Sequence, residues 1–131
     1  MQDELSRILL QNDTWRQALK HLESENISFK TRLADILATE LPKGQLENLE
    51  FFQTRFLKMD DQITLLRHEI RECQELLDQL LQTNDVLTRI IDLHKGLQEK
   101  IFSLHENFYR LRTDFNSYLS DSFPEISIKH I

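Results

Sequence analysis

Apolar residues recur at alternating steps of three and four along most of the chain. The longest regular series comprises Leu49, Phe52, Phe56, Met59, Ile63, Leu66, Ile70, Cys73, Leu77 and Leu80. This spacing places its members on one stripe of an α-helix and leaves polar residues on the outer faces. The pattern predicts helices that are buried along one stripe against other helices.

Residues 5–41 follow the same rule, but two of their stripe positions are polar. Asn12 and Asn26 stand where the spacing calls for an apolar residue. A polar residue in such a seam lowers stability and fixes the register or the number of helices. In the alternative interpretation, both amides reach solvent at the edge of the seam. The pattern favours neither.

Two short segments interrupt the helical pattern. Pro42 and Gly44 form the clearest break, because proline cannot continue the helical hydrogen bonds and the residue before it is pushed out of the helical region. Thr83, Asn84 and Asp85 favour caps and turns over helix interiors. The predicted helices cover residues 5–41, 46–82 and 85–120.

We expect an all-α fold in which residues 1–120 form a single antiparallel three-helix bundle or helical coiled coil. The three segments would each be about 55 Å long, and equal lengths suit such a bundle. The alternative is a helical hairpin whose second helix is very long and runs through Asn84. Residues 121–131 are expected to form a C-terminal tail, because Pro124 stops the helix.

The aromatic residues favour the bundle over the long helix. One group flanks the break at Pro42 and another lies near the end of the third segment: Phe29, Phe51, Phe52 and Phe56, and Phe108, Tyr109, Phe115 and Tyr118. Folding the chain back at Asn84 brings the two groups together at one end of the bundle. A continuous helix would leave them about 75 Å apart.

The positions of the two turns also predict which residues lie level with one another. Asn12, Cys73 and His94 fall on one level and would form the most polar layer of the interior. We expect His94 to be a core residue that is hydrogen-bonded to Asn12. Trp15 falls level with Gly96, and we expect the glycine to make room for the indole.

Composition narrows the class of protein. Only two glycines and two prolines occur in 131 residues, which excludes a turn-rich β fold. The formal net charge is −6 and no run of basic residues occurs, so nucleic acid and anionic membranes are poor partners. We find no signal-peptide pattern and no apolar run of membrane-spanning length, and the cytoplasm is the expected compartment.

Motifs for catalysis or cofactor binding are missing from the sequence. It contains no Gly-rich phosphate loop, no Gly-x-Ser-x-Gly and no Cys/His cluster, and neither His21 nor His68 begins a complete metal-binding motif. The single cysteine, Cys73, lies on the apolar stripe and has no nearby basic residue to activate it. We therefore expect no enzymatic activity, no cofactor and no metal.

The function that the pattern favours is protein–protein interaction, as a coiled-coil adaptor, a subunit or a small helical chaperone. Several apolar residues flank the predicted stripes, and three helices cannot easily bury them all: Leu9, Leu10, Leu37, Phe51, Leu57, Leu65, Leu76, Leu81 and Ile90. This surplus predicts a second interface, for a protein partner or for self-association into a homo-oligomer. The alternative is a ligand- or metal-binding bundle that uses the layer of Asn12, Cys73 and His94.

In size, acidity and helical pattern the chain resembles bacterial export chaperones of the flagellar type. The likeness lies in composition and helix pattern, so it assigns no role to any residue.

Overall fold

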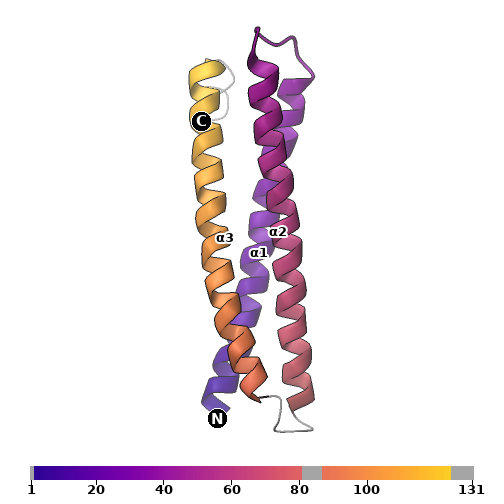
Figure 1. Cartoon of the computed structure of the whole chain (residues 1–131), viewed down its shortest axis with the longest axis vertical. Helices are drawn as coiled ribbons and strands as arrows, with labels where there is room; N and C mark the ends of the chain where they lie inside the picture. Colours follow the sequence, from indigo (N-terminus) through magenta and orange to yellow (C-terminus); the bar gives the residue numbers. More distant parts are fainter. Residues whose placement is uncertain (1, 81–86, 125–131) are drawn as a thin grey trace.

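Three helices of equal length make up the computed structural model, which describes residues 2–80 and 87–124 (Figure 1). Helix α1 spans Gln2–Leu37, α2 spans Gln45–Leu80 and α3 spans Leu87–Ser122. Each has 36 residues and is therefore about 54 Å long. α2 runs antiparallel to α1 and α3 and packs against both, so the all-α three-helix bundle is confirmed.

The first turn lies where Pro42 and Gly44 predict it, but α1 ends at Leu37, four residues before Leu41. The cause is Thr39, whose hydroxyl and backbone N–H both donate hydrogen bonds to the Ile36 carbonyl, at 2.7 and 3.1 Å. This carbonyl would otherwise lack a partner at the helix end. Gly44 has a φ of 88°, which allows the chain to reverse into α2.

The predicted second turn, Thr83 to Asp85, lies outside the described residues. The helices on either side of it settle the choice between the two folds, because α2 and α3 pack side by side. A single long second helix would carry residues 45–80 and 87–122 away from each other. The alternative fold is therefore wrong.

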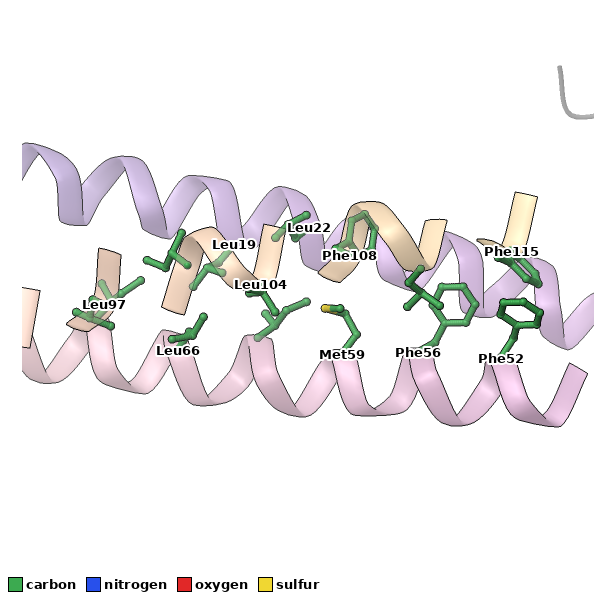
Figure 2. Close-up of a cluster of buried hydrophobic side chains, with 14 of the residues drawn as sticks. Leu19, Leu22, Phe52, Phe56, Met59, Leu66, Leu97, Leu104, Phe108 and Phe115 are labelled. Carbon is green, nitrogen blue, oxygen red and sulfur yellow. The ribbon is translucent and has the colours of Figure 1, made fainter. Parts of the chain in front are cut away.

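The aromatic residues gather at the end of the bundle that carries the first turn, as predicted. The Phe115 ring lies against the rings of Phe29, Phe52 and Phe56, with centroids 6.0, 5.2 and 5.1 Å away. Figure 2 shows this end of the core, with Met59 separating it from the aliphatic layers around Leu66 and Leu97. Phe56 and Phe115 are fully buried.

The backbones of α1 and α3 approach each other at fewer points than either approaches α2. Large side chains fill the space between them, because Phe29 of α1 lies against both Phe108 and Phe115 of α3. Ion pairs on the surface join all three helices, including Arg55–Asp114 at 3.0 Å. α2 is thus the central helix of the bundle.

The C-terminal segment begins later than predicted, because α3 continues to Ser122. The Phe123 ring then lies edge-on to Tyr118, with ring centroids 6.0 Å apart. The first residues after the helix are therefore docked on α3. Residues 125–131 lie outside the described part of the chain.

Candidate functional site

Five of the nine flanking apolar residues are exposed on the outer surface: Leu9, Leu10, Phe51, Leu57 and Leu65. Leu37 is partly buried and packs against the core. Leu81 lies outside the described residues. Five of the predicted residues are thus on the surface, and their role in an interface stays a prediction.

Leu76 and Ile90 are the exceptions, because both are buried in the core and cannot form part of a surface. Ile90 lies four residues before His94, so it continues the buried stripe of α3 in place of Ile91, which is half-buried. Leu76 is buried together with Leu77. At this level α2 buries a stripe wider than a strict seam, and both neighbouring leucines fit within it.

Four exposed apolar residues were missed by the sequence analysis: Ile27, Leu46, Phe102 and Tyr109. Phe102 and Tyr109 are the most unusual, since their exposed fractions are 64% and 61%. They are seven residues apart and lie on one face of α3. Each directly follows a core residue, Ile101 or Phe108, and this repeated pairing is the signal that could have revealed them.

The side chain of Arg112 places a positive charge beside the exposed Tyr109 ring of α3. The Arg112 guanidinium lies over the Tyr109 ring, 4.1 Å from its centroid. The same guanidinium is 3.6 Å from the Glu25 carboxylate of α1. Arg112 therefore fixes the Tyr109 ring in place beside α1, and a fixed aromatic ring loses little entropy when a partner covers it.

A shallow groove of about 370 Å³ runs between α2 and α3. Its floor contains the buried Leu66 and Leu104, and its rim contains the exposed Leu65. An ion pair crosses between the same two helices, with Lys100 Nζ 2.8 Å from Glu69 Oε1. The groove is thus partly apolar and is open along one side.

The predicted polar layer exists in part. Asn12, Cys73 and His94 are all buried, with exposed fractions of 1%, 0% and 3%. Burial raises the pKa of the Cys73 thiol, and the neighbouring Asn12 amide offsets this only in part. The thiol is therefore a neutral core group and not an activated nucleophile.

The predicted hydrogen bond between His94 and Asn12 is not present. The His94 ring is stacked on the Trp15 indole instead, with centroids 4.8 Å apart and the ring planes 27° apart. His94 Nε2 and both polar atoms of the Asn12 amide are buried without a hydrogen-bond partner of good geometry among the described residues. Burial, followed by the positive charge of Arg7, lowers the pKa of His94.

The predicted role of Gly96 is also wrong. Apart from the neighbouring backbone of α3 itself and the two adjacent residues, a Cβ atom built on Gly96 would meet no atom within 4 Å, so the glycine does not make room for the indole. The indole that it was expected to accommodate lies on His94, about half a turn earlier in α3. The indole contacts His94 because of the rotation of α3 about its own axis. The level of a residue along the bundle does not determine this rotation.

Residues 4–79 and 87–124, whose side chains are described, bring together no group of three or more His, Cys, Asp or Glu residues able to hold a metal ion. Within the described part of the chain, no helix is both long and apolar enough to cross a membrane. Comparison of the sequence with protein-family models, with curated proteins and with solved structures found no match.

Proposed function

We propose that the protein is a non-enzymatic interaction module of the cytoplasm, acting as an adaptor, a subunit or a small helical chaperone. The observation that carries the proposal is the pair of exposed aromatic side chains, Phe102 and Tyr109, on the outer face of α3. Large aromatic residues are enriched at the centres of protein interfaces, where they contribute most of the binding energy. Exposed rings contribute no burial energy to the isolated bundle.

The spacing of the pair suits a second helix. Residues seven apart lie on one face and about 10.5 Å apart along the axis, which is the repeat used by helices that pack side by side. Complete burial of one phenylalanine contributes about 1.5–3 kcal/mol. A symmetric contact buries each residue type twice.

The occupant that we propose is α3 of a second copy of this chain, in antiparallel orientation. A two-fold axis midway between the two aromatic residues sets Phe102 level with Tyr109 of the second copy. It also sets Glu99 level with Arg112 of that copy and Lys95 level with Asn116. Glu106 is the exception in this register, because it lies beside the two-fold axis and its carboxylate comes close to that of Glu106 in the second copy.

The test is the mass of the protein in solution, measured by sedimentation equilibrium over a range of concentrations. The wild-type protein is expected to dimerise, and the double variant Phe102→Ser/Tyr109→Ser is expected to remain monomeric with unchanged helicity. The matched control is Leu57→Ser/Leu65→Ser, which removes two apolar residues of α2 that are 52% and 59% exposed. A dimer that survives in the α3 variant, or a monomeric wild-type protein, contradicts the proposed self-association.

The second candidate is a ligand- or metal-binding bundle that uses Asn12, Cys73 and His94. The observation that favours it is the set of buried polar atoms without partners on Asn12 and His94. A bound ligand could satisfy such atoms. Metal analysis and an absorbance spectrum of the purified protein test this candidate, because stoichiometric metal or a chromophore would support it over the interaction module.

A further inference from the structure

Basic side chains cluster in a groove between α1 and α2, which the sequence does not reveal as a basic run. The groove has a volume of about 330 Å³ and is lined by Arg16, Lys20, Glu23, Arg67, Arg71 and Gln74. The lining thus includes four of the chain's 16 basic residues and one of its 22 acidic residues. In a chain with a net charge of −6, this groove is a local region of positive charge.

The internal ion pairs do not use up this charge. Arg67 is paired with Glu23, and Arg16 is 3.0 Å from Asp13. Lys20 and Arg71 form no ion pair within the described part of the chain. Two cationic groups in the groove are therefore available to an external anion.

The arrangement is unfavourable for the stability of the helices themselves. Arg16 and Lys20 are one turn apart on α1, and Arg67 and Arg71 are one turn apart on α2. Like charges at this spacing destabilise a helix by about 0.2–0.5 kcal/mol per pair. Arg67 serves the fold through its ion pair with Glu23, but Lys20 and Arg71 have no such role, and a binding role explains why these two free cations lie at the same groove.

We propose that this groove binds an acidic α-helical segment of another protein, which lies between α1 and α2 as a fourth helix. Carboxylates one turn apart on such a helix would match the one-turn spacing of the basic residues on each wall. The forked guanidinium group of Arg71, which has no partner within the described part of the chain, can bind a carboxylate through two hydrogen bonds.

Two exposed apolar residues lie beyond the groove in one direction, near the helix faces that line it. Ile27 lies eleven residues beyond Arg16, which is three turns along the same face of α1. Leu57 lies fourteen residues before Arg71, four turns along nearly the same face of α2. Both are about half exposed, at 50% and 52%. The bound helix would therefore carry acidic residues along one part and an apolar residue at one end.

The charge distribution favours a protein over a nucleic acid or a membrane. Those polyanions need a positive face that extends over many phosphates, whereas the positive charge here covers about two turns of each helix. A long polyanion would also meet the acidic surface beyond the groove. The inference uses α1 and α2 only, so it does not depend on self-association through α3.

The experiment uses a fluorescein-labelled helical peptide with pairs of glutamates one turn apart and leucine near one end. Its binding to the full chain is measured by fluorescence anisotropy. The double variant Lys20→Glu/Arg71→Glu is expected to weaken binding by about tenfold or more. The matched control Lys58→Glu/Arg110→Glu changes the net charge equally on other faces, at exposed residues without an ion pair in the described part of the chain. It is expected to retain binding.

Further controls separate this site from other sources of binding. Raising the salt from about 50 to about 300 mM is expected to weaken binding, because exposed charges are screened. Binding is expected to persist in Phe102→Ser/Tyr109→Ser, which leaves the groove unchanged. A peptide with lysine in place of each glutamate is expected not to bind.

Three results would overturn the inference. The first is that the wild-type protein does not bind the acidic peptide. The second is an equal loss of binding in both charge variants, which would indicate diffuse attraction and no defined site. The third is tighter binding of a DNA duplex or of inorganic phosphate than of the peptide, which would assign the groove to phosphate groups. Circular dichroism of each variant confirms that the helices are intact.

Discussion

Asn26 and Asn12 are both buried in α1, two heptads apart, yet their surroundings differ. The Asn26 Nδ2 group donates to the Phe56 carbonyl at 3.1 Å and to the Asp60 carboxylate at 2.7 Å, and Asp60 also binds Lys30. In the Asn26 side chain, only the Oδ1 atom has no hydrogen-bond partner among the described residues. The Asn12 amide lies beside the thiol of Cys73, and neither of its polar atoms has a partner of good geometry among the described residues. The same residue type thus fixes the contact between α1 and α2 in one place and adds little in the other.

The two regions around these residues differ in the same sense. Around Asn26, rings from all three helices are in contact, and a charged network closes the surface beside them. Around Asn12, the interior combines a stacked Trp15–His94 pair with buried polar atoms that lack partners. A polar core residue stabilises a bundle only where its partner is provided, so the Asn26 region should contribute more stability than the Asn12 region.

The largest effect is expected from Phe115→Ala. Phe115 is fully buried and contacts three other rings, so its loss leaves a cavity at the aromatic end. The free energy of unfolding, measured with urea, should fall by about 3–5 kcal/mol. The exposed Leu10→Ala serves as the control and should change it by less than about 0.5 kcal/mol. Equal losses in the two variants would refute the proposed importance of the ring cluster.

The two asparagines provide the most direct test of the comparison, because their replacement should act with opposite sign. Asn26→Ala removes two hydrogen bonds and should lower the free energy of unfolding by about 1–3 kcal/mol. Asn12→Leu replaces unpaired polar atoms with an apolar group of similar shape and should raise it by about 1 kcal/mol. Urea denaturation of both variants measures the difference. A loss at Asn12 as large as that at Asn26 would mean that the two sites are equivalent.

A smaller gain is expected from Gly96→Ala. The position is inside α3, and the added methyl group meets open space. The free energy of unfolding should rise by about 0.5–1 kcal/mol, because alanine favours the helix over glycine. Thermal denaturation measures the change. A destabilised variant would restore the idea that the indole of Trp15 needs this space.

The smallest effect concerns pH and is confined to the Asn12 region. The pKa of His94 lies below its ordinary value of about 6.5, so the unfolded chain binds the proton more tightly than the folded chain. The stability that neutral His94 contributes is therefore complete above about pH 6.5 and declines as the pH falls below it. Melting temperatures measured across this range, for the wild-type protein and for His94→Gln, isolate the effect. An unchanged pH profile in the variant would assign the decline to other groups.

The helices and the aromatic end could be predicted from the sequence, because burial repeats with the helical period and antiparallel packing fixes residue levels. The level of Asn12 and Cys73 followed from the same reasoning. The level of a residue along the bundle does not predict how each helix is rotated about its own axis. This rotation buries Ile90 in place of Ile91 and sets the Trp15 indole on His94.

The two surface features differ in how far the sequence reveals them. Phe102 and Tyr109 each directly follow a core residue of α3. If the predicted buried stripe is drawn one position wider, both are counted as core residues and their exposure is missed. The basic groove joins residues of α1 and α2 that are about 50 positions apart in the chain, so no basic run marks it. Such clusters become visible only when two helices are set side by side.

The central place of α2 has a consequence for the speed of folding. Each neighbour of α2 in space is also its neighbour in the chain, and the contact between α1 and α3, which are far apart in sequence, is the smallest of the three. Chains dominated by such local contacts close short loops and fold within microseconds to milliseconds. Either hairpin, α1–α2 or α2–α3, can therefore form first, with α2 as the common template on which the remaining helix docks.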